Sequence, residues 1–271
     1  MAFANQKGGV GKTTSAVNTA VTLAARGYRV LLLDMDPQGN ATSSLGIDKQ
    51  ELESSIYDVL VDEAPIAECR IADVRPNLDV LPTTSTLAAA EIELVTVPDR
   101  ERRLRRMCAG IRTEYDIALI DCPPSLGLLT INALTAADSI VVPIQCEFLA
   151  LEGVSQLIHT IDLTRRQLNP TLDLLGVVMT MYDARTRLSA LVVEEVRRFF
   201  PDRIFETVIP RSVRLAEAPS YGQAISEYDP RSRGGSAYET FADEIVTRLG
   251  LSVPSSTGSN STHQSQESNT P

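Results

Sequence analysis

A glycine-rich stretch near the start of the chain constrains the fold more than any other feature of the sequence. It reads QKGGVGKTT over residues 6–14, follows the short apolar run at residues 2–4, and leads into residues 13–26, where apolar side chains recur at helical spacing. Glycine lets successive backbone N–H groups turn toward one anion, and the start of a helix adds free N–H groups and the positive end of its dipole. The stretch therefore predicts a strand, a phosphate-binding loop and a helix.

Two lysines stand in this loop. Lys12 is placed to neutralise the β- and γ-phosphates of a nucleotide, and the Thr13 hydroxyl is placed to coordinate Mg²⁺. The usual pattern of such loops has glycine where this chain has Gln6, and a second lysine, Lys7, follows at the next position. The chain contains three lysines against 22 arginines, so two of the three in one loop indicate a specific use. The residues predicted to contact the nucleotide here are Lys7, Gly8, Gly9, Val10, Gly11, Lys12, Thr13 and Thr14.

Carboxylates end two segments that have the pattern of buried strands. Residues 29–34 are a nearly continuous apolar run that ends at Asp34, with Asp36 in the following loop, and residues 115–121 end in the same way at Asp121. Open α/β sheets bind ligands at the carboxyl ends of their strands, so we expect these carboxylates near the phosphates, where they suit Mg²⁺-bound water or the attacking water. A simpler alternative is that Asp34 and Asp36 only cap the next helix.

Strand and helix patterns alternate along the rest of the chain. Strands are predicted at residues 78–81, 139–143, 172–181 and 204–209, and helices at residues 54–61, 86–94, 99–112, 149–167, 188–200 and 236–249. This alternation predicts an α/β fold over residues 1–250, with a single doubly wound, mostly parallel sheet and helices on both faces. Residues 251–271 are rich in Ser, Thr, Asn and Gln, so we expect a disordered tail there.

Composition excludes several other classes of protein. The four cysteines show no Cys-x-x-Cys spacing and the chain has two histidines, so neither a disulfide framework nor a zinc site is indicated. No apolar run approaches the about 18 residues of a membrane span, and the start lacks signal-peptide features, so we expect a cytoplasmic protein. A net charge of −10 argues against nucleic-acid binding unless arginines gather on one face. The arginine run at residues 100–106 is more typical of a solvated helix face.

Six motifs in colinear order carry a family resemblance. They are KGGVGKTT at residues 7–14, DMDPQGN at 34–40, DCPPSLG at 121–127, MYDARTR at 181–187, PRSVRLAEAPSY at 210–221 and YDPRSRG at 228–234. Together they closely resemble the chromosomal ParA proteins, often called Soj, which are P-loop ATPases of the deviant Walker A (ParA/MinD) superfamily. The resemblance covers about residues 2–250. The first motif alone is diagnostic of the superfamily.

The resemblance implies a role for each matching residue at the nucleotide. Lys7 would contact nucleotide across a dimer interface, Lys12 would bind the β- and γ-phosphates, and Thr13 would bind Mg²⁺. Asp36 would position the hydrolytic water, and Asp121 would hold the water shell of the metal.

The resemblance also implies contacts farther along the chain. Pro210 and Ser212 would lie against the adenine, although the family commonly has asparagine where this chain has Ser212. Arg185 and Arg214 match family arginines that bind DNA without sequence preference. From the residues alone, ordinary solvated arginines would be the simpler interpretation.

The implied function is that of an ATP-dependent chromosome or plasmid partitioning ATPase with weak, Mg²⁺-dependent activity. Its ATP-bound homodimer would bind double-stranded DNA on the nucleoid, and a ParB/Spo0J-like partner would stimulate hydrolysis and release. The alternative is a MinD-like positioning ATPase that acts on a membrane or a protein cargo, but residues 252–271 lack the basic, amphipathic helix of a membrane anchor. A relative such as the nitrogenase iron protein would need cysteines in glycine-rich settings, which Cys122 and Cys146 do not have.

Overall fold

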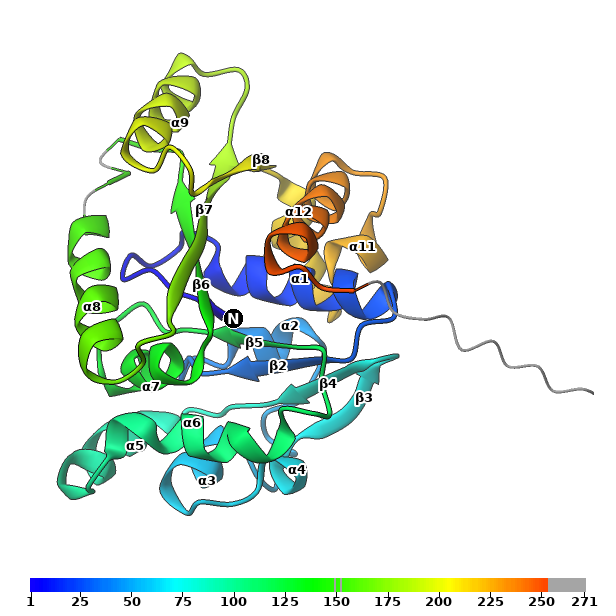
Figure 1. Cartoon of the computed structure of the whole chain (residues 1–271). Coiled ribbons are helices and arrows are strands. Elements are labelled where there is room, and N and C mark those ends of the chain that lie inside the picture. The colour runs from blue at the N-terminus through cyan, green and yellow to red at the C-terminus, as the bar shows by residue number, and fades with distance from the viewer. Residues whose placement is uncertain (149, 152, 253–271) are drawn as a thin grey trace, which may run out of the picture.

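The computed structural model describes residues 1–148, 150–151 and 153–252 of the chain. Eight strands form one sheet in the order β3-β4-β2-β5-β1-β6-β7-β8 (Figure 1). All neighbouring strands are parallel except β3, which runs antiparallel to β4 at one edge. The predicted doubly wound, mostly parallel sheet is therefore confirmed. The strands are β1 (Ala2–Phe3), β2 (Val30–Asp34), β3 (Ile71–Arg75), β4 (Leu78–Leu81), β5 (Ile117–Asp121), β6 (Ser139–Gln145), β7 (Asp173–Tyr182) and β8 (Ile204–Pro210).

Helices cover both faces of the sheet (Figure 1). The α-helices are α1 (Lys12–Ala25), α2 (Asn40–Ser44), α3 (Ile56–Val61), α4 (Ile66–Cys69), α5 (Leu87–Glu93), α6 (Arg103–Cys108), α7 (Leu128–Ala136), α8 (Val154–Gln167), α9 (Arg187–Phe199), α10 (Val213–Glu217), α11 (Ile225–Tyr228) and α12 (Arg233–Leu249). Four 3₁₀ turns are η1 (Leu94–Thr96), η2 (Arg100–Arg102), η3 (Ala109–Ile111) and η4 (Ala218–Tyr221). Among the described residues, none of the helices has the length and apolar character needed to cross a membrane.

Side-chain alternation along the strands assigns the helices to two layers. In β2, Val30 and Leu32 pack into the apolar cluster that contains α1, α11 and α12. Leu31 and Leu33 pack into the other cluster, with α3, α5, α7 and α8. Because both faces of β2 are covered, all five of its residues are buried, which explains its nearly continuous apolar sequence.

The glycine-rich loop leaves the sheet at its centre. The two-residue strand β1 lies between β5 and β6, and Phe3 is in register with Asp121 of β5. The chain therefore emerges at the carboxyl edge of the sheet, next to the ends of β2 and β5. This edge holds the candidate site.

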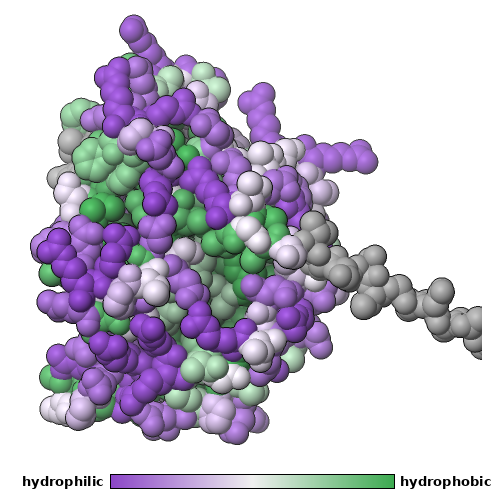
Figure 2. Space-filling view, viewed as in Figure 1, coloured by the Kyte–Doolittle hydropathy of each residue, from purple (hydrophilic) through white to green (hydrophobic). Residues whose placement is uncertain are grey.

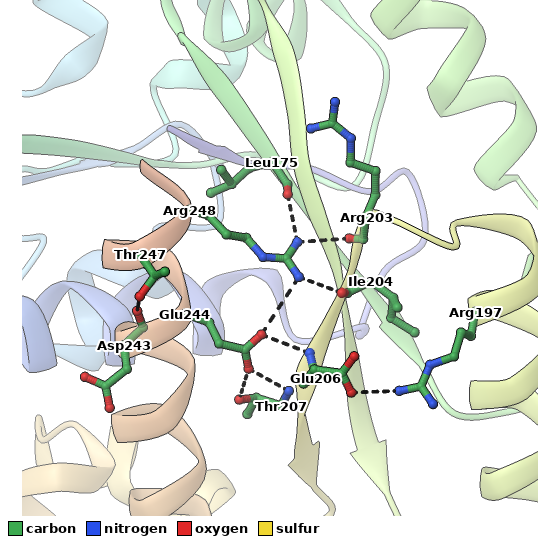
Figure 3. Close-up of polar contacts among 10 residues, drawn as sticks. All are labelled: Leu175, Arg197, Arg203, Ile204, Glu206, Thr207, Asp243, Glu244, Thr247 and Arg248. Carbon is green, nitrogen blue, oxygen red and sulfur yellow. Dashed lines mark hydrogen bonds and ion pairs between the residues drawn. The ribbon is translucent and has the colours of Figure 1, made fainter. Parts of the chain in front are cut away.

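The sheet edge formed by β8 is closed by α12 (Figure 3). The Glu244 carboxylate accepts the backbone N–H groups of Glu206 at 2.9 Å and Thr207 at 2.7 Å. The Arg248 guanidinium donates to the carbonyls of Leu175 at 3.0 Å and Ile204 at 2.6 Å, so it spans β7 and β8. These contacts satisfy backbone groups that an uncovered edge would leave free.

The prediction of one helix over residues 99–112 is wrong. The segment is divided into η2, α6 and η3, and its arginines are not simply solvated. Arg102 and Arg105 donate to backbone carbonyls of residues 167 and 168 at the end of α8, and Arg103 pairs with Glu63 at 2.6 Å. These arginines therefore act as long-range caps and ion pairs. Strand β3 and helix α7 were not predicted from the sequence. The disordered tail was predicted for residues 251–271, of which residues 253–271 lie outside the described residues.

Candidate functional site

The loop after β1 is curled by glycines in the left-handed region. Gly9 has φ 74° and Gly11 has φ 88°, and Gly11 immediately precedes α1. The Lys12 ammonium donates to the carbonyl oxygen of Lys7 at 3.1 Å, inside its own loop. Burial lowers the pKa of Lys12, and the charge of Asp121 opposes that shift. A buried ammonium that closes on its own loop is well placed to accept an anion.

Two buried carboxylates lie beside this loop. Asp34 and Asp121 end the neighbouring strands β2 and β5, and they are in register with each other. The Asp121 carboxylate is fully buried, and within the described part of the chain neither of its oxygens has a hydrogen-bond partner. Burial and then the charge of Asp34 raise the pKa of Asp121 well above its usual range, and the Thr13 hydroxyl, which lies beside the carboxylate without a hydrogen bond of normal geometry, opposes this shift. An unpartnered buried carboxylate is costly, so this site fits a hard cation with oxygen ligands such as Mg²⁺.

Asp34 organises the loop that follows β2. One carboxylate oxygen accepts both the backbone N–H and the hydroxyl of Thr42 at 2.8 Å, and the other accepts the N–H of Asp36 at 3.2 Å. Thr42 in turn accepts the N–H of Thr83 at 3.1 Å. Burial raises the pKa of Asp34 to about 6, against the lowering effect of its hydrogen bonds. The network ties both ends of the loop to β2.

Asp36 is distinguished from Asp34 by its contacts. Among the described residues its carboxylate accepts only the N–H of Gln38, at 3.0 Å, which is a local turn within the loop. Helix α2 has Gly39 at its N-cap, and the carboxylate that reaches the first turn of α2 belongs to Asp34. The capping alternative therefore describes Asp34, and it does not describe Asp36.

Lys7 is held within its own chain. Its ammonium forms an ion pair with Glu147, just after β6, and both side chains are about one-third exposed, at 36% and 35%. The neighbouring Gly8 is exposed, and a β-carbon there would meet only Pro124, at 3.9 Å. The two residues thus lie on the open side of the loop, where another molecule can approach.

A cavity of about 250 Å³ adjoins the loop at the ends of β7 and β8. The register of Tyr182 with Pro210 brings those strand ends together, and Met181 at the end of β7 has φ 52°. Pro210 and Ser212, nearly 200 positions from the loop in sequence, are thereby placed against it. The cavity is lined by Gly11, Thr14, Thr180, Met181, Ile209, Pro210, Arg211, Ser212, Leu215, Ala216 and Tyr238.

The two arginines singled out for DNA are exposed but paired. Arg185 forms a two-pronged contact with Asp183, at 2.9 and 2.7 Å, which lowers the pKa of that carboxyl to about 2. Arg214 donates to Glu217 at 3.1 Å and lies over the ring of Tyr228. In the motifs that contain these two arginines and in the one that leads into α12, four further exposed arginines have no ion-pair partner among the described residues. They are Arg187, Arg211, Arg231 and Arg233.

A second hollow, of about 300 Å³, lies at the opposite edge of the sheet. Met1, Ile117 and Ser139, at the amino ends of β1, β5 and β6, contribute to its wall together with Leu249. Parallel sheets bind ligands at the carboxyl ends of their strands, and the loop and both carboxylates are at that other edge. This hollow is therefore separate from the candidate site.

Sequence reasoning missed several residues of the site. Thr42 and Thr83 hold the loop of Asp36, Glu147 pairs with Lys7, and Met181 lines the cavity beside Pro210. Thr83 and Glu147 lie within a few positions of a strand end at the loop edge, which is the only signal that could have found them, and Thr42 has no such signal.

Comparison with known proteins gives consistent matches. The family described as "AAA domain" matches residues 1–174. The sporulation initiation inhibitor protein Soj of Bacillus subtilis (strain 168) is 56% identical over 246 residues, which are 91% of this chain and 97% of that protein. The chromosome partitioning protein ParA of Caulobacter vibrioides is 50% identical over 250 residues, which are 92% of this chain and 94% of that protein.

Among solved structures, the chain is similar to cobyrinic acid a,c-diamide synthase from Mycobacterium smegmatis with bound ADP and magnesium. That structure is 38% identical, has a TM-score of 0.81, and is matched over 92% of this chain and 94% of its own.

Proposed function

The chain belongs to the ParA/Soj family of chromosome-partitioning ATPases, and we propose that it is an ATP-driven partitioning switch. In this proposal it binds ATP and Mg²⁺, dimerises with ATP, binds double-stranded DNA on the nucleoid without sequence preference, and hydrolyses ATP weakly until an activator of the ParB/Spo0J type stimulates it. The observation that carries the proposal is the convergence of the glycine-rich loop with the unpartnered Asp121 carboxylate at the carboxyl edge of the sheet.

ATP would be bound by the glycine-rich loop, by Asp121 and by the cavity at the ends of β7 and β8. The backbone N–H groups of residues 8–14 and the Lys12 ammonium receive the phosphates, and Lys12 exchanges the Lys7 carbonyl for a phosphate oxygen. Thr13 and, through water, Asp121 hold Mg²⁺, which neutralises charge that develops on the phosphates. The adenine occupies the cavity beside Pro210 and Ser212.

Hydrolysis needs a carboxylate that can hold the attacking water. Asp36 is suited to this because its loop is fixed by Asp34 and Thr42, while its own carboxylate bonds only the nearby N–H of Gln38. A water held by Asp36 is oriented for attack in line with the leaving group. Asp36 is therefore a catalytic residue in this proposal, and Asp34 is a positioning residue.

Dimerisation completes the site. Lys7 contacts the nucleotide of the partner subunit, which requires its ion pair with Glu147 to open. The ion pair of Lys7 with Glu147 competes with that contact, which supports a low basal rate of hydrolysis.

DNA binding follows from the grouping of arginines. The backbone N–H of Arg211 donates to the carbonyl of Tyr182 at 2.9 Å, so the segment after β7, with Arg185 and Arg187, and the segment after β8, with Arg211 and Arg214, start side by side. Each arginine makes a weak, salt-screened contact with a phosphate, so a two-fold dimer that doubles the set binds measurably where a monomer does not.

The test measures DNA retention and dimer formation with ATP, with ADP and without nucleotide, at two salt concentrations. We expect retention with ATP alone, independent of DNA sequence and weaker at high salt. Arg185→Ala or Arg214→Ala should lose retention and keep ATP-dependent dimerisation. A wild-type protein that binds no DNA with ATP at low salt would exclude the partitioning function.

A further inference from the structure

A groove of about 410 Å³ lies between α3 and α5, away from the nucleotide cavity. Its walls include Leu52 and Glu53 in the loop before α3, Tyr57 on α3, and Thr86 and Ala89 around the start of α5. None of these residues has a role in the function proposed above. We call this hollow the α3–α5 groove.

Two large apolar side chains are exposed just beyond the groove residue Ala89, namely Ile92 on α5 and Val95 on η1. Ile92 is 77% exposed and Val95 is 55% exposed, which makes Ile92 the most exposed of the large apolar side chains described. Ile92 lies three positions after Ala89, so the two share one side of α5. Apolar side chains are visible among hydrophilic neighbours at the lower left of Figure 2, where α5 lies in Figure 1. Adjacent exposed apolar residues of this size beside a hollow are typical of an interaction site.

The charge around the groove is negative. Glu53 lines the groove and Glu91 and Glu93 flank Ile92 on α5, and none of the three forms an ion pair within the part of the chain that the structure describes. Glu93 instead accepts the Tyr57 hydroxyl at 2.7 Å. The nearby Arg100 is paired with Glu101 at 3.1 Å. The surface therefore complements a segment that carries positive charge and large apolar side chains, and it would repel a second copy of itself.

The groove is connected to the loop of Asp36 by direct contacts. Thr84, which lines the groove, follows Thr83, whose N–H donates to Thr42 at 3.1 Å. Thr42 donates to Asp34 at 2.8 Å, and Asp34 accepts the N–H of Asp36. A ligand that shifts the backbone at residues 83–86 therefore acts on the carboxylate that positions the attacking water.

The groove also contacts the loop after β5. Glu91, on α5, lies directly against Gly127, where an added β-carbon would collide with its carboxylate. Both loops that follow the buried carboxylates Asp34 and Asp121 are thus within reach of the same surface.

We propose that the α3–α5 groove, with Ile92 and Val95, is the docking site for a short basic segment with large apolar side chains, carried by the protein that stimulates hydrolysis. The proposal rests on the proposed function, because it requires an activator. Docking there raises turnover through the contacts of Thr83, Thr42 and Asp34, and it leaves the nucleotide cavity free.

The test uses the full chain, the ParB-like protein of the same genome, and 15-residue peptides that tile that protein. ATP turnover is measured with each, and binding of the stimulating peptide is measured by fluorescence anisotropy. We expect the active peptide to be basic and apolar. Ile92→Ser with Val95→Ser should weaken its binding about tenfold or more, since two buried apolar contacts are lost. Glu53→Gln with Glu93→Gln should weaken it severalfold at low salt and little at high salt.

Matched controls change the same chemistry elsewhere. Leu188→Ser with Leu191→Ser alters exposed leucines of α9, and Glu195→Gln with Asp202→Asn removes two exposed charges. Controls that respond like the wild type, together with groove variants that keep basal turnover and ATP-dependent dimerisation but lose stimulation, support the proposal.

Two results would overturn the docking site alone. In one, the groove variants are stimulated as strongly as the wild type. In the other, they lose ATP-dependent dimerisation, which would make this surface a contact between subunits. If neither the ParB-like protein nor any peptide stimulates the wild type, the activator step of the proposed function fails first and the docking site fails with it.

Discussion

Replacing Asp183 with asparagine tests directly whether Arg185 contacts DNA. Arg185 is among the most exposed arginines, at 87% of its side chain, yet its Nε and Nη2 groups both donate to Asp183. The hydrogen bonds from Arg185 lower the pKa of Asp183 to about 2. The ion pair is therefore intact at every pH above the usual carboxyl range and is lost only as the pH falls toward 2, so acidification cannot free Arg185 under conditions where DNA binding is measured.

The size of the effect follows from the number of arginines released. A two-fold dimer would gain one free Arg185 per subunit, hence two cations for two phosphates. Each phosphate contact adds about 0.9 to the slope of log affinity against log salt, so the slope should steepen by about 1.8. Between about 50 and about 200 mM salt, the Asp183→Asn protein should then lose about 12-fold more affinity than the wild type loses. This is an upper limit, because it assumes that the wild-type Arg185 makes no phosphate contact.

The assay is a salt titration of ATP-dependent binding to a labelled duplex of random sequence, followed by fluorescence anisotropy. Asp202→Asn is the matched control, since it removes the same charge from an exposed turn where no ion pair is present among the described residues. Equal steepening in both variants would mean that net charge alone is responsible. A slope that is unchanged both in Asp183→Asn and in Arg185→Ala would remove Arg185 from the DNA contact.

Four further results are expected. Lys12→Ala should abolish ATP binding measured by calorimetry, because the buried Lys12 ammonium is the positive charge that points into the loop where the phosphates would bind. A variant that binds ATP with wild-type affinity would contradict this. Asp36→Ala should bind ATP, lose about a hundredfold or more of its turnover, and elute as a trapped dimer; unchanged turnover would leave Asp36 a loop residue. Gly8→Val should fold, since Gly8 is exposed, yet stay monomeric with ATP; normal dimerisation would argue against a contact of Lys7 with the partner subunit. Arg248→Ala should lower the free energy of unfolding, measured in urea, by about 2–4 kcal/mol, and Arg197→Ala, at an exposed ion pair, should lower it by less than about 1 kcal/mol. Equal losses would show that the bonds of Arg248 to the carbonyls of β7 and β8 in Figure 3 do not stabilise the sheet edge.

The parts of the fold that could be predicted are those set by local sequence. The apolar runs that end at Asp34 and Asp121 are buried strands, and the glycines at 9 and 11 adopt the left-handed backbone that a curled loop requires. Neighbouring parallel strands present their carboxyl ends at one edge, so the meeting of these aspartates with Lys12 followed from the pattern alone. The position of Pro210 did not, because its register with Tyr182 depends on strand order, which the sequence pattern leaves open.

Polar side chains with distant partners were the least predictable. Arg102 reads as a residue on a charged helix face, but it bonds backbone carbonyls at the end of α8, 65 and 66 positions away. Thr42 and Thr83 are unremarkable in sequence, and their hydrogen bond exists because β2 and β4 are neighbours in the sheet. Such contacts have no periodic signal, since each depends on where two strands or helices are placed by the core.

The net charge was a poor guide to DNA binding, because it does not say where in the fold the charges lie. A total of −10 suggests a surface that repels DNA, but it averages over carboxylates whose charge is already engaged. Glu63 holds Arg103 and Arg106, and Asp116 holds Arg29, both away from the ends of β7 and β8. At those strand ends, exposed arginines outnumber the carboxylates that pair with them in the described chain. Whether this edge attracts a polyanion therefore depends on how many of its arginines are free of a carboxylate partner. The salt titration of Asp183→Asn measures how many phosphate contacts are gained when Arg185 is released.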